Sequence, residues 1–149
     1  MDLKKQDFVK YYLPVILWMA FIFWMSTGTL SAENTFSYVE MLLRFFNPKI
    51  SARDMNLIHA IVRKSAHLIE YFIMGILFFR AYRGSSVERW NWKWPLYALL
   101  SLVLWAVGDE FHQSFVATRT ASVKDVLIDT AGGVLAQFTM MLKNGLRER

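Results

Sequence analysis

The first hydrophobic stretch of the chain lies just after three lysines. Residues Tyr11 to Leu30 contain no charged side chain, and Lys4, Lys5 and Lys10 precede them. About twenty apolar residues are enough for an α-helix to cross the hydrocarbon core of a membrane. A basic start followed by an apolar run is also typical of a signal peptide. The tryptophans in this run and its full length favour a permanent span over residues 11–30.

Three further apolar runs are shorter, and each carries polar residues near one end. They are long enough to cross a membrane only if those polar residues lie within the crossing. The run that ends at Arg80 and Arg83, for example, has only Tyr71 to Phe79 free of charge. The sequence therefore predicts three more spans, over residues 63–82, 95–115 and 123–142.

A short amphipathic helix is predicted between the first and second spans. Within residues 31–47 the apolar residues recur at helical spacing, as Phe36, Val39, Leu43 and Phe46. Such a helix suits either the membrane surface or a position packed over the other helices. Pro48 disfavours helix at the residue before it and so predicts the end of this element. Ser51, with Asp54 in the first turn, predicts the N-cap of the next helix.

The composition supports a membrane protein. The chain is 55% hydrophobic and 16% aromatic, and its 19% of charged residues is below the roughly 25% of an average soluble domain. It contains no cysteine, which excludes disulfides and thiolate metal sites. A net charge of +5 would suit nucleic acid, but the basic residues sit between apolar runs and form no single face, so no nucleic-acid partner is expected.

The basic residues also predict an orientation. With four crossings, ten of the 17 Lys and Arg residues fall on the side of the two termini. Because basic residues favour the cytoplasmic side, we expect both termini in the cytoplasm. The expected fold is an all-α integral membrane four-helix bundle, formed by residues 1–149 as one domain, with the amphipathic helix between spans one and two.

The topology places polar residues of three spans at matching depths. At ~1.5 Å per residue, His67, Asp109 and Asp129 lie at roughly 20 Å from the cytoplasmic edge, within a hydrocarbon core of about 30 Å. A second layer lies about 6 Å further out. It contains Arg63, His112 and Asp125. Polar groups at such depths are costly and are functional candidates by default.

Helical phase supports this grouping. Arg63, His67, Glu70 and Met74 share one face, and Asp125, Asp129, Gly132 and Ala136 share another. Gly132 and Ala136 would let a neighbouring helix approach closely. In the third span Asp109 shares a face with either His112 or Gln113. Glu110 points about 100° away and is expected to line a different wall.

Several kinds of chemistry fit these residue types. General acid and base work would use five candidate catalytic residues: His67, Glu70, Asp109, Glu110 and His112. Substrate binding would use a second group: Arg63, Lys64, Gln113, Arg119, Asp125 and Asp129. Arg63, Lys64 and Arg119 could instead hold a phosphate or a carboxylate at the outer interface. Pairing of Arg63 or Lys64 with Asp125 or Asp129 would be purely structural.

A metal site is the remaining alternative. His67-x-x-Glu70 and Asp109-x-x-His112 each place an imidazole and a carboxylate on one helix face, which suits zinc or manganese. Neither pair is a full zinc signature, and the neighbouring Arg63 and Lys64 would repel a cation. No metal ligand is therefore assigned, and the sequence identifies no cofactor.

The combination of motifs resembles the VanZ-like membrane proteins. It comprises Arg63-Lys-Ser-Ala-His67-Leu-Ile-Glu70-Tyr71, Asp109-Glu-Phe-His-Gln113-Ser-Phe115, Arg119, Asp125 and Asp129-Thr-Ala-Gly-Gly133. The resemblance implies a small integral membrane protein related to one associated with teicoplanin resistance. It implies no defined biochemical activity. Many relatives carry Pro-Gly where this chain has Ala117-Thr118, so the geometry of that turn is not carried over.

The function expected from the sequence is a membrane protein with an outward-facing polar pocket. Its expected partners are membrane lipid and a lipid-linked envelope precursor or a glycopeptide. The pocket would bind such a lipid or precursor, and whether it also modifies it is left open. The alternatives are a membrane protein whose charged cluster serves assembly, and a small proton-coupled transporter.

Overall fold

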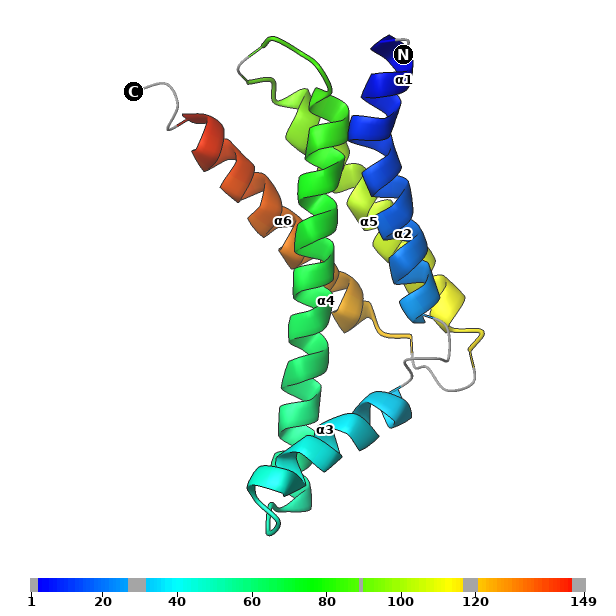
Figure 1. Ribbon diagram of the computed structural model, residues 1–149, viewed down its shortest axis with the longest axis vertical. Helices are drawn as coiled ribbons and strands as arrows, with labels where there is room; N and C mark the ends of the chain where they lie inside the picture. The colour runs from blue at the N-terminus through cyan, green and yellow to red at the C-terminus, as the bar shows by residue number, and fades with distance from the viewer. Residues whose placement is uncertain (1–2, 27–31, 89, 117–120, 146–149) are drawn as a thin grey trace.

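The computed structural model describes residues 3–26, 32–88, 90–116 and 121–145, and within them it contains helices and no strand (Figure 1). The helices are α1 Leu3–Asp7, η1 Phe8–Tyr12, α2 Leu13–Ser26, α3 Ala32–Phe46, α4 Ala52–Arg83, α5 Lys93–Gln113 and α6 Val123–Gly145. The expectation of an all-helical chain is confirmed. Each predicted span lies largely within helical structure, although residues 27–30 of the first lie outside the described part and α5 ends at Gln113, before the predicted end of the third span.

The first helical segment is continuous but irregular. α1 leads into η1, a single π-helical turn, and α2 follows without a break. Pro14 explains the irregularity, because proline has no N–H to donate to the carbonyl four residues earlier. Leu13 donates its N–H to the Phe8 carbonyl instead, in the five-residue spacing of a π turn.

α4 is the longest helix, and its two ends are set by local chemistry. Ser51 accepts a hydrogen bond from the Asp54 N–H at 3.1 Å, which confirms the predicted N-cap. At the other end Gly84 has a φ of 53°, a conformation that glycine adopts without a Cβ clash, and its N–H bonds the Arg80 carbonyl at 2.9 Å.

The packed core is formed by α4, α5 and α6, and α2 lies against α4 and α5. Tyr71, Met74 and Phe79 of α4 are fully buried there, together with Ala98 and Leu102 of α5. α1 begins and α6 ends at one end of the molecule, whereas α2 and α5 end towards the other (Figure 1).

Small residues allow α4 and α6 to approach closely. A Cβ added to Gly132 would lie 2.5 Å from the Leu68 carbonyl oxygen, and one added to Gly75 would lie 2.7 Å from the Ala136 Cβ. The predicted packing role of the glycines in α6 is thus confirmed. Gly75 is the matching small residue on α4.

α3 crosses α4 near the start of that helix, beyond the rest of the bundle (Figure 1). The Phe36 ring packs edge-on against His59, with ring centroids 5.3 Å apart. Burial, followed by the nearby Arg63 charge, lowers the pKa of His59 below its usual value. The expected apolar stripe is only partly correct, because Phe46 is 76% exposed.

Two helical stretches are long and apolar enough to cross a membrane, among the residues that the structure describes. They are Lys5–Ser26 and Val123–Asn144. The remaining two predicted spans, in α4 and α5, carry buried or half-buried charged residues that lower their hydropathy, such as Glu70 and Asp109.

Candidate functional site

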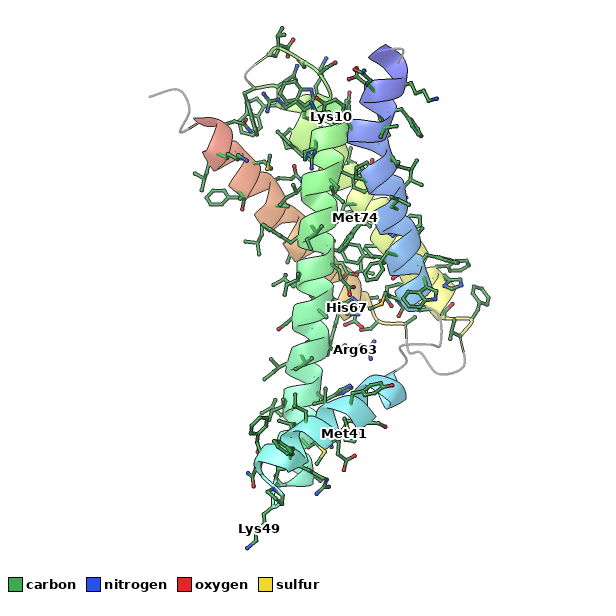
Figure 2. All side chains as sticks on the ribbon, viewed as in Figure 1. Lys10, Met41, Lys49, Arg63, His67 and Met74 are labelled. Carbon is green, nitrogen blue, oxygen red and sulfur yellow. The ribbon has the colours of Figure 1, made fainter. Side chains whose placement is uncertain are left out.

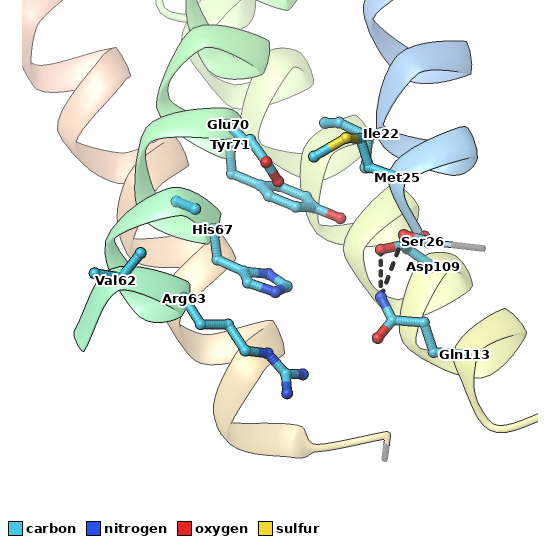
Figure 3. A pocket seen from close by; sticks show the side chains of 11 residues that line it. Ile22, Met25, Ser26, Val62, Arg63, His67, Glu70, Tyr71, Asp109 and Gln113 are labelled. Atoms are coloured by element: carbon cyan, nitrogen blue, oxygen red, sulfur yellow. Dashed lines mark hydrogen bonds between the residues drawn. The ribbon is translucent and has the colours of Figure 1, made fainter. Parts of the chain in front are cut away.

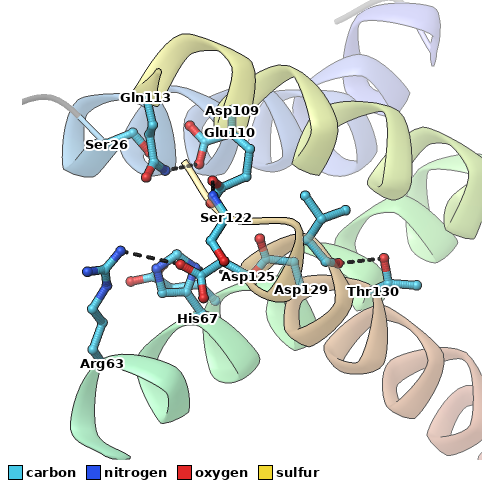
Figure 4. A network of polar contacts seen from close by, with 12 residues as sticks. Ser26, Arg63, His67, Asp109, Glu110, Gln113, Ser122, Asp125, Asp129 and Thr130 are labelled. Carbon is cyan, nitrogen blue, oxygen red and sulfur yellow. Dashed lines mark hydrogen bonds and ion pairs between the residues drawn. The ribbon is translucent and has the colours of Figure 1, made fainter. Parts of the chain in front are cut away.

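The polar residues of α4 and α6 meet as two cross-helix pairs (Figure 4). The His67 Nδ1 lies 3.1 Å from the Asp129 Oδ1, and the Asp129 side chain is fully buried. One turn away on both helices, the Arg63 guanidinium lies 3.4 Å from the Asp125 carboxylate. The sequence placed His67 with Asp129 and Arg63 with Asp125 in two layers, but it left open whether Arg63 or Lys64 pairs with Asp125 or Asp129. Lys64, the alternative partner, is exposed.

A second polar cluster links α5 to α2. The Gln113 side-chain N–H group donates to the Asp109 Oδ2 at 2.9 Å and lies 3.3 Å from the Ser26 hydroxyl oxygen. All three side chains are buried. Of the two residues that could share a face with Asp109, the structure selects Gln113.

His112 lies apart from this cluster. Its ring packs against Phe23 of α2, with centroids 4.6 Å apart, and it does not line the cavity described below. The structure therefore does not bring His112 together with His67. Its candidate role as a base near Asp109 has no support from this geometry.

Glu110 joins α5 to the start of α6. Its Oε2 accepts a hydrogen bond of 2.7 Å from the Ser122 backbone N–H (Figure 4). Glu110 faces a different depression from Asp109, beside Val107 and Phe111, as helical phase predicted. The contact gives Glu110 a positioning role at the entry to α6.

A cavity of about 180 Å³ lies between α2, α4 and α5 (Figure 3). Its apolar wall includes Ile22 and Met25 from α2 and Val62 from α4. Its polar wall collects residues from all three helices: Ser26, Arg63, His67, Glu70, Asp109 and Gln113. The Arg63 side chain remains 26% exposed, so it lies near the surface edge of the cavity.

Several buried polar atoms of this cavity have no hydrogen-bond partner among the described residues. They are the Tyr71 hydroxyl, the Asp109 Oδ1 and the Gln113 Oε1. Tyr71 itself is fully buried. A buried polar group costs about 1–3 kcal/mol unless a partner, such as water or a ligand, satisfies it. This arrangement is suited to a ligand that supplies the missing partners.

A metal centre is not supported by the geometry. Within the described part of the chain, no three His, Cys, Asp or Glu residues are grouped so that they could hold a metal ion. The two i, i+3 pairs considered in the sequence do not converge, because His112 faces Phe23 while Asp109 faces Gln113.

Two polar residues of the cavity, Tyr71 and Ser26, were not among the candidate site residues, and one candidate lies outside the described residues. Tyr71 is one helical turn from His67, so phase could have found it. Ser26 is the last described residue of an apolar helix and carries no local signal. Arg119 and the Ala117-Thr118 turn lie outside the described residues.

Comparison with known proteins identifies one family. The family model described as VanZ/LLP1 matches residues 11–144, which is most of the chain. Neither a curated protein nor a solved structure matches.

Proposed function

The chain belongs to the VanZ/LLP1 family, and on that premise we propose that it binds a polar group of a cell-envelope lipid or lipid-linked wall precursor in an outward-facing pocket. The pocket is the cavity between α2, α4 and α5. Its family and its two apolar helices indicate a membrane protein. The proposal links it to glycopeptide resistance, teicoplanin in particular.

The proposed topology has four crossings, made by α2, α4, α5 and α6, as a four-helix membrane bundle with both termini in the cytoplasm. The excess of basic residues on the side of the termini supports this orientation. The start of α1 and the end of α6 lie at one end of the molecule, which supports the placement of both termini on the same side of the membrane (Figure 1). The cavity and the two cross-helix pairs then lie in the outer half of the membrane.

The observation that carries the proposal is the set of unpartnered polar atoms in the cavity. The Asp109 Oδ1 and the Gln113 Oε1 accept hydrogen bonds, and the Tyr71 hydroxyl both donates and accepts. A ligand with N–H or O–H groups would satisfy all three. Ammonium, amide and hydroxyl groups of envelope lipids and wall precursors have this chemistry.

The size of the cavity limits what enters it. A volume of about 180 Å³ is below the ~300 Å³ at which drug-sized sites begin. A headgroup-sized portion of a lipid would fit, whereas a complete precursor would not. The rest of such a molecule would remain along the exposed surface of the helices.

The geometry also suits proton transfer. With Asp129 ionised, the His67 Nδ1–H donates to it, which leaves the other ring nitrogen of His67 as an acceptor. A histidine oriented by a buried carboxylate is a common general base. Glu70 and Asp109 line the same cavity and could receive or return the proton. Modification of the bound group would proceed through these residues.

The test replaces Asp109 by asparagine, which keeps the shape of the side chain and its contact with Gln113. We expect normal protein abundance in membranes and loss of the protein's contribution to teicoplanin resistance. Glu88→Gln, a matched loss of charge at an exposed position outside the cavity, should change neither. An Asp109→Asn variant with full abundance and unchanged resistance would contradict the proposal.

A second candidate function is assembly without chemistry. It is favoured by one observation: both charged pairs, Arg63 with Asp125 and His67 with Asp129, join α4 to α6. If assembly is their role, His67→Gln should lower the abundance of folded protein and the resistance phenotype together. Loss of phenotype at normal abundance would favour the pocket.

A further inference from the structure

Three cations converge at the end of the molecule where α1 begins, opposite to the proposed pocket. Lys10 of η1 and Arg80 and Arg83 of α4 line a cavity of about 340 Å³. The turn after α4 closes it with Ser85 and Ser86. Figure 2 shows Lys10 at the opposite end of the bundle from Arg63.

Among the described residues, these cations form no ion pair with a carboxylate. Within the described part of the chain, the ion pairs closer than 4.0 Å involve Arg44, Arg63 and His67, and none of the three cavity cations. One carboxylate, Asp7, lies beside the cavity, where its Oδ2 accepts a hydrogen bond from the Ser85 hydroxyl at 3.2 Å, so the three cations outnumber it. Three like charges facing one cavity repel each other unless an anion joins them.

Neutral contacts hold two of these cations in place. The Arg83 guanidinium lies 5.9 Å from the centre of the Trp94 ring and 3.5 Å from the Asn144 side-chain oxygen. The Lys10 ammonium lies 5.0 Å from the centre of the Tyr11 ring. Such contacts orient a cation without cancelling its charge.

Helix capping does not account for the whole arrangement. Arg80 and Arg83 suit the negative carboxyl end of α4, where basic residues are favourable. Lys10, however, belongs to a different helix, so the charge at the carboxyl end of α4 does not explain its position in this cavity. Basic side chains that converge on one cavity from two helices are typical of an anion-binding site.

We infer that this basic cavity binds the phosphate group of an anionic phospholipid. The lipid source is favoured by the neighbouring surface of η1, where Phe8, Val9 and Tyr12 are 45–50% exposed and would contact acyl chains. Basic pockets between helices at a membrane surface bind anionic headgroups in this way. This site shares no residue with the pocket proposed above, and its binding test does not depend on membrane orientation.

The test measures lipid binding to the full-length protein purified in a neutral detergent. We expect short-chain phosphatidylglycerol to bind more tightly than phosphatidylcholine of the same chain length. Lys10→Gln combined with Arg80→Gln should weaken phosphatidylglycerol binding by about tenfold or more, because each basic contact to an anionic headgroup is substantial. Both side chains are exposed, so the fold should be retained, which thermal unfolding would verify.

The matched control is Lys93→Gln combined with Lys143→Gln, which removes the same charge from exposed positions outside the cavity. It should bind phosphatidylglycerol like the wild type. Equal weakening in the two double variants would overturn the inference, since net charge alone would then explain binding. Displacement of the lipid by an equal concentration of inorganic phosphate would overturn the assignment to a lipid.

Discussion

The two cross-helix pairs between α4 and α6 differ in how much stability they can supply. Asp129 is fully buried against His67, while Arg63 and Asp125 are partly exposed. A buried charge pair gains little net stability over an apolar one, but loss of a single partner is costly because a buried charge is left behind. The pairs therefore fix the relative position of α4 and α6 more than they add to stability. That fixed position holds the wall of the cavity in place.

Removal of the Tyr71 hydroxyl tests whether this group binds a ligand or only supports the fold. Tyr71→Phe removes an oxygen that has no partner among the described residues, so the thermal stability should stay the same or rise slightly. If the hydroxyl contacts a ligand, the resistance phenotype should weaken at unchanged abundance.

The control for this change is Tyr82→Phe. The Tyr82 hydroxyl is 2.6 Å from the Ser101 hydroxyl, outside the cavity. Its loss should cost about 0.5–1.5 kcal/mol of stability without affecting resistance. A Tyr71→Phe variant that unfolds at a lower temperature and keeps its phenotype would assign the hydroxyl to structure.

At the residue scale, the sequence predicted which residues share a helix face and a depth, but it left their pairing open. Arg63, His67, Asp125 and Asp129 repeat every four residues, so depth and phase together placed them as two facing layers. The same reasoning could not choose between His112 and Gln113, because spacings of three and four both return close to one face. Tertiary packing decides between them, because the His112 ring packs against Phe23, a residue from a distant part of the chain.

At the element scale, the close contact between α4 and α6 depends on their small residues. Gly132 lies against the backbone of α4 at Leu68, and backbone cannot move aside as a side chain can. This contact brings His67 and Asp129 within hydrogen-bonding distance. The polar pairs between α4 and α6 therefore require a small residue at position 132.

Replacement of Gly132 by alanine tests this requirement. The added Cβ would clash with the Leu68 carbonyl, so we expect a loss of about 1–3 kcal/mol of stability, as overpacked sites show. Gly108→Ala is the matched control, since a Cβ there meets nothing within 4 Å. It should stabilise α5 by up to about 1 kcal/mol. Thermal unfolding in detergent measures both, and equal effects would refute the packing role.

The helices themselves were largely predictable, and the exceptions have physical causes. Ser51 and Gly84 set the two ends of α4 through local signals that the sequence displays. The π turn of η1 was not predicted, because proline in a helical run can equally produce a kink. The expected burial of the apolar stripe on α3 was only partly correct. Helical periodicity predicts which residues share a face, but it does not predict how much of that face the neighbouring helix covers. Phe46 lies beyond the contact with α4.

At the scale of the whole molecule, the two ends carry different electrostatics. At one end Arg63 is matched by Asp125, and carboxylates outnumber cations around the cavity. At the other end Lys10, Arg80 and Arg83 face one cavity and form no ion pair with any described carboxylate. A membrane with a negatively charged cytoplasmic surface would favour the second end inside. These three cations are among the basic residues whose count favours that orientation.

The absence of native cysteine makes this orientation directly testable. Ser85 follows the end of α4 and Ser114 follows the end of α5, and the two exposed residues lie at opposite ends of the bundle (Figure 1). In intact cells a membrane-impermeant thiol reagent should label Ser114→Cys and leave Ser85→Cys unlabelled until the membrane is opened. The reverse pattern would place the polar pocket on the cytoplasmic side and exclude an envelope precursor as its ligand.

The π turn before Pro14 has a consequence for how this chain tolerates length changes. A π turn holds one residue more than an α turn, and each residue rotates a helix by about 100°. Because the extra residue is taken up within a single turn, the side chains before it keep their direction relative to α2. Loss of one residue from Phe8–Tyr12 would restore a regular α turn and leave Lys4 and Lys5 facing the same way. This segment is therefore the part of the first helical stretch that best tolerates a deletion of one residue.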